Sequence, residues 1–296
     1  MSESITKLPI ESLPLWLPSE RIGYGLRYIL TSFCIMEGVH LIFLRYCFRK
    51  QSGGEGKQQQ QRNNNSPMKQ RLSKTAVQFT HISVCGTLAT LGVYYWYFVL
   101  ADGGIPIGFD ERFTGHTDMG LFGYIMIAYN IWSAYVAWLI GSGEGMAMTF
   151  HHIMTTLCGI LAGFTHHGWR YYSPFFGGVM EISSFPLAIM NAFKARPDWI
   201  ESMPKTYLRV RICFAVAFIL VRGVLWFKCI FPFMGDQWSV ISSAKYATVV
   251  RYNTCIASFM PAVLLSFLQV FWLQIILKAL FKMVIKVKPD KMQRRD

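Results

Sequence analysis

Seven long apolar stretches constrain the fold of this chain more than any other feature of its sequence. A helix needs about 20 mostly apolar residues to cross the hydrocarbon core of a bilayer. The stretches that reach this length are residues 24–48, 77–101, 119–140, 146–167, 173–193, 212–233 and 254–287. Lipid offers no hydrogen-bond partner to a bare backbone, and no short segments of alternating polarity indicate a membrane barrel. The sequence therefore predicts an all-α multi-pass membrane protein with seven transmembrane helices.

The basic residues lie between these stretches and do not form one patch. The 296 residues include 29 Lys and Arg against 16 Asp and Glu, and this net charge of +13 could by itself indicate nucleic-acid binding. However, 19 of the 29 fall within residues 49–74, 194–211 and 278–295, which seven crossings place on one side. Lys and Arg collect on the cytosolic side of membrane proteins. We therefore expect a lumenal N-terminus, a cytosolic C-terminus, an endomembrane location such as the endoplasmic reticulum, and no nucleic-acid partner.

A polar segment separates the first predicted helix from the other six. Residues 51–70 contain four consecutive Gln and three consecutive Asn, and such a segment has little apolar surface to bury. We expect a lumenal tail and first helix over residues 1–50, a cytosolic linker over 51–70, a six-helix domain over 71–288 and a basic cytosolic tail over 289–296. The first helix is expected to lie at the periphery of the six-helix bundle.

Polar side chains within the predicted helices are the best candidates for functional residues. Each ionisable group there costs free energy unless it meets a partner or a wet cavity. His151 and His152 lie on the fourth stretch. Thr155 and Thr156 follow one turn later, where a hydroxyl could orient either ring. Glu181 lies near the middle of the fifth stretch.

Two interpretations of these residues stay open. In the first, the two histidines, Glu181 and Arg222, which lies near the middle of the sixth stretch, meet across a cavity and form a functional site. In the second, they form inter-helix hydrogen bonds, with Glu181 and Arg222 as a buried ion pair. For Glu37 and His40 on the first stretch, we expect a local hydrogen bond.

The histidine spacing argues against a metal centre. His166 and His167 make a second pair, but His166 is 14 residues from His152. That spacing is about 21 Å along a helix, too far for one metal ion. The seven histidines do not follow the patterns of membrane di-iron enzymes, and P-loop, dinucleotide-binding and zinc-protease motifs are missing from the sequence. We expect no metal and no bound cofactor.

Two segments resemble the TLC-domain family, which includes ceramide synthases and translocating-chain-associated proteins. They are residues 150–157, FHHIMTTL, and residues 180–186, MEISSFP, and the resemblance extends over about residues 71–288. It implies a six-helix barrel that accommodates lipid. In the synthases, the counterparts of His151 and His152 transfer a fatty acyl group from coenzyme A to a sphingoid amine. The synthases carry paired aspartates where this chain has Glu181 and then Ser184, so the chain looks more like the TLC-domain-containing proteins that regulate membrane lipid composition.

The sequence thus favours a role in lipid metabolism or membrane lipid homeostasis, with acyl transfer as its enzymatic form. In that form acyl-CoA is the co-substrate, and membrane lipids or long acyl chains are the partners. The candidate catalytic residues are His151, His152 and Glu181, and the candidate substrate-binding residues are Thr155, Thr156, Ser184 and Arg222, the last as an anchor for an anionic head group.

Two other functions are weighed against acyl transfer. The main alternative is a lipid-binding, lipid-sensing or lipid-trafficking protein without catalysis. A seven-helix receptor fits less well, because the third stretch ends in residues 140–144, IGSGE, without an acidic-Arg-Tyr switch. A homodimer is compatible with the two lipid functions.

Overall fold

A computed structural model describes residues 19–52, 67–100, 109, 112, 119–141, 145–165, 169–242 and 249–287. Within these ranges, seven helices are long and apolar enough to cross a membrane. They are Arg21–Arg49, Gln70–Val99, Gly120–Leu139, Met146–Phe164, Arg170–Ala195, Pro204–Ser242 and Asn253–Lys282. The prediction of an all-α multi-pass membrane protein is confirmed.

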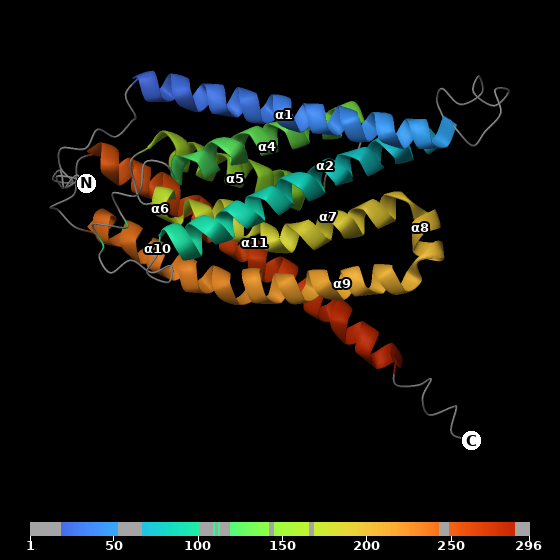
Figure 1. Cartoon of the computed structure of the whole chain (residues 1–296). Coiled ribbons are helices and arrows are strands. Elements are labelled where there is room, and N and C mark those ends of the chain that lie inside the picture. Colours follow the sequence, from blue (N-terminus) through green and yellow to red (C-terminus); the bar gives the residue numbers. More distant parts are fainter. Residues whose placement is uncertain are drawn as a thin grey trace.

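The helices run roughly lengthwise beside one another, and three of the spans contain π-helical segments (Figure 1). The elements are α1 (Ser19–Ser52), α2 (Pro67–Tyr94), η2 (Tyr95–Val99), α4 (Gly120–Leu139), α5 (Met146–Phe164), α6 (Trp169–Pro174), η4 (Phe175–Val179), α7 (Glu181–Ala195), α8 (Pro197–Ser202), α9 (Pro204–Phe218), η5 (Ile219–Leu225), α10 (Trp226–Ser242) and α11 (Val249–Val287). Each π-helical segment is continuous with an α-helix of the same span; η2 forms the last turn of its span, whereas η4 and η5 lie within theirs.

Several helices extend beyond the predicted apolar stretches. The sixth span was predicted over 212–233, whereas α9, η5 and α10 together run from Pro204 to Ser242. The predicted linker over 51–70 is also shorter, since α1 ends at Ser52 and α2 begins at Pro67. Hydropathy locates only the apolar part of a helix, whereas backbone hydrogen bonds extend it into its polar flanks. Residues 53–66 and the second histidine pair, His166 and His167, lie outside the described residues.

One end of the bundle, called the basic end below, contains the short connecting helix α8 (Figure 1). Arg49, Lys74, Arg196, Lys205 and Arg209 lie at or near this end. The chain enters α5 from the same end, so His151 and His152 lie within two turns of it. The polar residues of α5 are therefore nearer the basic end than the opposite end.

Helix α1 packs against α2 and α4, and a polar contact anchors it there. The Trp132 indole Nε1 on α4 donates a 3.0 Å hydrogen bond to Glu37 Oε2. The His40 ring packs edge-on against the same indole, with 5.9 Å between ring centroids. The predicted hydrogen bond between Glu37 and His40 is therefore wrong. The buried indole N–H needs an acceptor, and the carboxylate of Glu37 supplies it.

Glycines let α4 and α5 approach closely. A Cβ added at Gly123 would lie 2.5 Å from the Gly159 carbonyl oxygen and 2.6 Å from the Gly163 nitrogen. Small residues at such positions are typical of helix packing in membranes, where contact between backbones replaces the hydrophobic driving force. The close approach brings the histidine-bearing face of α5 against α4.

The end of the bundle opposite the basic end holds a compact group of three polar side chains, the Asp236 cluster. Arg112 donates two hydrogen bonds of 2.8 Å, from Nε and Nη2, to the two carboxylate oxygens of Asp236. The Tyr172 hydroxyl donates a third bond, 3.1 Å long, to Oδ2. The hydrogen bond to Asp236 raises the pKa of the Arg112 guanidinium further above its usual value. This cluster joins α6 and α10 to the segment before α4.

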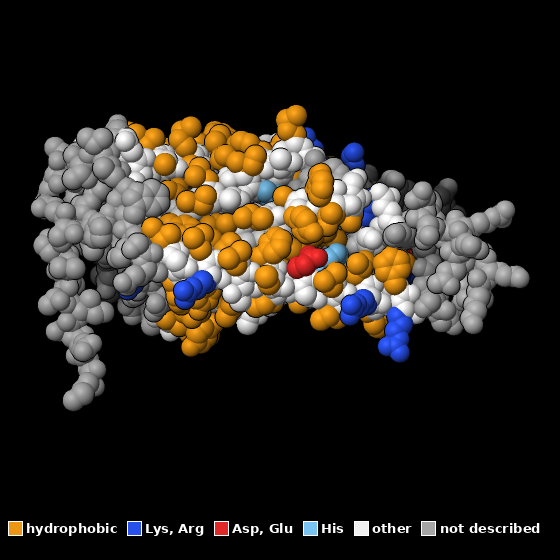
Figure 2. Space-filling model, turned by 90° about the horizontal axis from the view of Figure 1, so that it is seen from above, with side chains coloured by type: hydrophobic (Ala, Val, Ile, Leu, Met, Phe, Trp, Pro, Cys, Tyr) orange, Lys and Arg blue, Asp and Glu red, His pale blue; other side chains and the backbone are white. Residues whose placement is uncertain are grey.

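The outer surface is apolar along most of the length of the molecule. Figure 2 shows hydrophobic side chains over most of one face, with Lys and Arg gathered toward its ends. On α1, outward-facing residues include Leu30, Ile35 and Ile42. Contiguous apolar surface of this extent would be unfavourable in water and suits contact with lipid. The chain is an integral membrane protein.

Candidate functional site

A cavity lies inside the six-helix bundle, with about 1230 Å³ of empty space including its mouth. Side chains from α2, α4, α5, α7, η5 and α11 line it, together with residues of η4 and α10. No described residue of α1 contributes to the lining. The six helices that follow the polar segment thus enclose the cavity, and α1 lies outside it.

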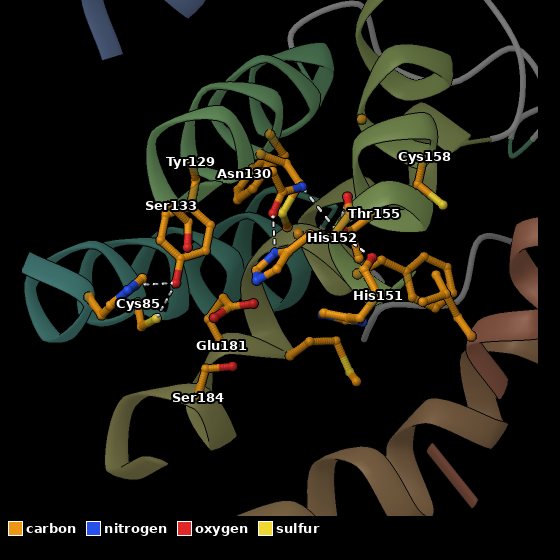
Figure 3. A pocket seen from close by; sticks show the side chains of 18 of the residues that line it. Cys85, Tyr129, Asn130, Ser133, His151, His152, Thr155, Cys158, Glu181 and Ser184 are labelled. Carbon is orange, nitrogen blue, oxygen red and sulfur yellow. Dashed lines mark hydrogen bonds between the residues drawn. The ribbon is translucent and has the colours of Figure 1, made fainter. Parts of the chain in front are cut away.

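A chain of hydrogen bonds fixes the orientation of His152. The Thr155 hydroxyl lies 2.9 Å from the backbone carbonyl of His151 and donates its proton there. It therefore accepts the 3.0 Å hydrogen bond from Asn130 Nδ2. Asn130 then presents Oδ1 to His152, whose Nδ1 lies 2.9 Å away and donates a proton. In the neutral ring the basic nitrogen is consequently Nε2, and Figure 3 shows this edge turned toward Glu181.

His151 points away from its neighbour and toward α11. Its ring packs edge-on against Trp272, with 5.2 Å between centroids, and lies 5.7 Å from the His152 ring. The Nδ1 atom of His151 is buried and has no hydrogen-bond partner within the part of the chain that the structure describes. Adjacent residues on a helix point about 100° apart, so the two rings address different walls of the same cavity.

Glu181 contributes a carboxyl group to the cavity wall. It is the first residue of α7, directly after η4 and Met180, and only 8% of it is exposed. The carboxyl lies close to the Cys85 thiol of α2. Figure 3 places the carboxyl beside the His152 ring. The expected acid and histidine pair therefore share one cavity.

Arg222 is held by neutral groups from two helices. Its Nε donates a 2.7 Å hydrogen bond to Ser183 Oγ, and Nη2 donates a 3.0 Å bond to Ser184 Oγ on the same helix. Its Nη1 lies 3.5 Å from Gln269 Oε1 on α11. The alternative of a buried ion pair between Glu181 and Arg222 is therefore wrong, because serine hydroxyls and an amide occupy the positions a carboxylate would take.

A second polar group on the cavity wall connects it to α1. The Tyr129 hydroxyl lies 2.7 Å from His81 Nδ1 and 3.8 Å from Cys85 Sγ. The His81 ring packs edge-on against Trp132, with 5.3 Å between centroids. Since Trp132 also binds Glu37, a continuous series of contacts runs from α1 to the cavity.

Two of the three π-helical segments occur where the polar residues lie. Segment η4 ends two residues before Glu181, and Arg222 lies within η5. A π-helical turn inserts a residue into a helix and redirects the side chains that follow, and such turns are frequent at functional sites. Local backbone geometry thus helps to aim both charged groups into the bundle.

Several residues at the site were not singled out from the sequence. Asn130, Ser183 and Gln269 are not among the catalytic or substrate-binding residues predicted from the sequence. An amide in a transmembrane stretch is itself a signal, because it needs hydrogen-bond partners in lipid. Conversely, Thr156 donates a 2.7 Å hydrogen bond to the His152 backbone carbonyl and does not line the cavity. Thr155 and Ser184 do line it.

The polar groups of the cavity do not form a metal site. Among the described residues, no group of three or more His, Cys, Asp and Glu side chains is arranged to hold a metal ion. The cavity instead combines an oriented imidazole, a carboxyl group and a guanidinium with largely apolar walls. Such a combination suits a long-chain ligand that carries one polar group.

Comparison with known proteins identifies the family. The family model of the TLC domain matches residues 71–278, which is most of the chain and includes all six helices around the cavity. A search of curated proteins found no match. The matched region includes the paired histidines of α5, Asn130 of α4, Glu181 of α7 and Arg222 of η5. The chain belongs to the TLC-domain family of lipid-associated membrane proteins.

Proposed function

We propose that this protein transfers a long acyl group from acyl-CoA to an amine or hydroxyl of a lipid acceptor inside the cavity. The observation that carries the proposal is the hydrogen-bond chain from the α5 backbone through Thr155 and Asn130 to His152. It presents Nε2 as the basic nitrogen of an imidazole at the cavity wall. A general base needs a fixed tautomer and a position within reach of its substrate.

The proposed reaction has one acyl transfer with two proton movements. His152 Nε2 accepts the proton of the acceptor amine or hydroxyl while the acceptor atom attacks the thioester carbonyl carbon. A carbon–nitrogen or carbon–oxygen bond forms, and the carbon–sulfur bond of the thioester breaks. The imidazolium then returns its proton to the coenzyme A thiolate. No metal or redox cofactor takes part in this sequence.

The other polar residues have supporting roles in this proposal. Glu181, with its carboxyl beside the His152 ring (Figure 3), stabilises the imidazolium that forms during transfer. His151, whose Nδ1 has no partner in the described structure, is a second group able to exchange a proton with a ligand. The apolar side chains Met126, Met180, Leu187 and Leu265 of the lining provide surface for an acyl chain.

The proposal includes an orientation in the membrane. The basic end, with α8, faces the cytosol, and the C-terminus lies on the same side, because Lys and Arg concentrate there. Acyl-CoA would then approach from the end nearer His152. Asn64 belongs to a glycosylation sequon within residues 53–66, outside the described residues, and should stay unglycosylated in an endoplasmic reticulum membrane. A glycan on Asn64 would overturn this orientation.

The test is an acyl-transfer assay on the full-length protein purified into lipid nanodiscs. Labelled long-chain acyl-CoA is supplied with a mixed lipid extract, and acylated products and free coenzyme A are measured. His152→Ala should reduce transfer by about a hundredfold or more, while the midpoint of thermal unfolding stays near that of the parent. His40→Ala, a histidine variant outside the cavity, is the matched control and should retain transfer. Absence of transfer by the parent protein, or normal transfer by folded His152→Ala, would contradict the proposal.

A non-catalytic lipid-binding function is the second candidate, and one observation favours it. The cavity walls are largely apolar, and neutral side chains hold the Arg222 guanidinium there, which suits retention of a lipid without chemistry. A binding protein would form no product from acyl-CoA but would retain lipid on purification. Mass spectrometry of lipids bound to the parent, His151→Ala and His152→Ala proteins separates the two functions, because a binder changes the lipids it retains without any turnover.

A further inference from the structure

Arg222 carries a buried positive charge that the protein does not neutralise by direct contact. Its side chain is 8% exposed, and guanidinium groups stay protonated in proteins. Its three hydrogen-bond partners, Ser183, Ser184 and Gln269, are all neutral. In the described ranges no carboxylate forms an ion pair with it. A buried cation without an anionic partner is costly, so the site favours a ligand that brings one.

Glu181 acts on this charge from a distance and does not replace a counterion. It lies one turn before Ser184 on α7, and its charge influences Arg222. Its carboxyl lies near Cys85, on the α2 wall, and makes no hydrogen bond to the guanidinium. The carboxylate of Glu181 is therefore close enough to interact electrostatically with Arg222, but it does not accept a hydrogen bond from the guanidinium N–H groups.

The three partners hold the guanidinium in a fixed position at the cavity wall. A guanidinium has five N–H donors, and the hydrogen bonds to Ser183, Ser184 and Gln269 use one on each nitrogen. One donor on each terminal nitrogen remains. Two adjacent donors in one plane match the two oxygens of a carboxylate or phosphate group. Arg222, Ser184 and Gln269 all line the cavity, so a ligand in the cavity can reach this position.

The apolar side chains that line the cavity indicate the chemistry of the part of the ligand beyond its anionic group. Trp226 and Leu265 line the cavity near Arg222, and Met180 and Leu187 extend the apolar wall along α7. An anion with a short polar body would leave these walls unfilled. A long alkyl chain would cover them.

We infer that Arg222 binds the anionic group of a long-chain amphiphile, a carboxylate or a phosphate monoester, within the cavity of the bundle. The inference rests on the lipid cavity of the proposed function, but it requires no transfer chemistry. Ser183, Ser184 and Gln269 hold the guanidinium in place. The remaining two donors bind the ligand oxygens.

Equilibrium binding to the purified full-length protein in nanodiscs of neutral phosphatidylcholine tests the inference. The probes are palmitate, hexadecyl phosphate and the uncharged hexadecanol, at a pH where both acids are ionised. The parent protein should bind at least one of the two anions about tenfold or more tightly than hexadecanol. The preference between palmitate and hexadecyl phosphate shows whether the anion is a carboxylate or a phosphate monoester.

Variants assign the preference to Arg222. Arg222→Leu should lose the preference for the anions and bind hexadecanol as the parent does. Arg222→Gln, which keeps hydrogen-bonding groups without the charge, provides a second variant if the leucine variant does not fold. Arg209→Leu removes an exposed arginine outside the cavity and is the matched control, because it should leave the preference unchanged. Glu181→Gln should strengthen anion binding a few-fold, because it removes a nearby negative charge.

Two outcomes would overturn the inference. One is equal binding of anions and hexadecanol by the parent protein. The other is an undiminished anion preference in folded Arg222→Gln. The outcome for acyl transfer is independent, because a protein that prefers palmitate but transfers no acyl group would support this inference and contradict the proposed function. A protein that transfers acyl groups but shows no preference for anions would support the proposed function and contradict this inference.

Discussion

The Asp236 cluster and the cavity both place charged side chains inside the described part of the protein, but the charges have different kinds of partner. In the Asp236 cluster, Arg112 contributes both donors of a two-pronged ion pair and Tyr172 adds a third bond. In the cavity, Glu181 and Arg222 are also buried, yet neutral residues hold the guanidinium and the carboxylate lies apart. The first group satisfies its charges within the protein, whereas the second keeps its charges available at the wall of a cavity.

The difference indicates separate roles for the two groups. A charge paired within the protein stabilises the fold and has little left to offer a ligand. A charge placed at a cavity by neutral partners costs stability that a bound ligand can restore. We therefore expect variants of the Asp236 cluster to change stability and variants of the cavity to change lipid binding or transfer.

The largest expected effect on stability comes from breaking the Asp236 cluster. Asp236→Leu leaves the Arg112 guanidinium and the Tyr172 hydroxyl without their acceptor, and should lower the free energy of unfolding by about 3 kcal/mol. Thermal unfolding of the detergent-purified protein measures the loss. The double variant Arg112→Leu, Asp236→Leu should recover part of it, because no unpaired charge remains. If Asp236→Leu lost acyl transfer but kept the stability of the parent, the structural role assigned to the Asp236 cluster would be wrong.

A smaller effect, on activity, should follow from changing Asn130. Asn130→Leu removes the acceptor that keeps the proton on His152 Nδ1, and we expect transfer to fall by about tenfold while the protein stays folded. Asn130→Asp retains an acceptor oxygen and should keep more activity than the leucine variant. Rates of acyl transfer per folded protein provide the measurement. Equal activity of the two variants would show that the tautomer of His152 does not matter.

The contact between α1 and α4 should contribute less to stability than the Asp236 cluster. Trp132→Phe removes the indole donor of Glu37 and should lower the free energy of unfolding by about 1–2 kcal/mol. Adding Glu37→Leu to this variant should cause little further loss, since the carboxylate then has no partner to lose. Thermal unfolding of the single and double variants tests this. If the losses in free energy of unfolding caused by Trp132→Phe and Glu37→Leu simply added in the double variant, the two residues would not interact, contrary to the hydrogen bond in the structure.

The smallest effect is expected for an exposed ion pair at the basic end. Arg196 donates hydrogen bonds of 3.0 and 2.8 Å to Asp198, and these bonds lower the pKa of the Asp198 carboxyl. The pair therefore stabilises the folded state at pH values above the ordinary carboxyl pKa of about 3.9. Its contribution disappears as the pH falls through the lowered pKa of the folded state.

This ion pair provides a reference for the buried groups. Because both side chains are partly exposed to water, Asp198→Asn should change the free energy of unfolding by less than about 0.5 kcal/mol. Unfolding measured at pH 7 and near pH 3 should show the difference between parent and variant shrinking at the lower pH. A loss as large as that of Asp236→Leu would remove the distinction between exposed and buried pairs.

The sequence alone was sufficient for the membrane class, the helix count and the main polar candidates. Seven apolar stretches define seven spans, because a bare backbone cannot cross lipid unless its hydrogen bonds are internal. His151, His152, Glu181 and Arg222 were identifiable because ionisable residues are rare and costly in such stretches. These inferences depend only on the properties of each segment in a bilayer.

The tertiary structure decided which side chains meet. The bond between Asn130 and His152 requires α4 and α5 to pack closely at Gly123, Gly159 and Gly163. Residues 159–163 form a G-x-x-x-G pattern that favours close helix packing, but only the tertiary structure shows that α4 is the partner helix. Arg222, which lies within the π-helical segment η5, binds serines of α7, although Glu181 lies one turn away on the same helix. The sequence determines which polar groups enter the membrane, whereas helix packing and backbone geometry determine their partners.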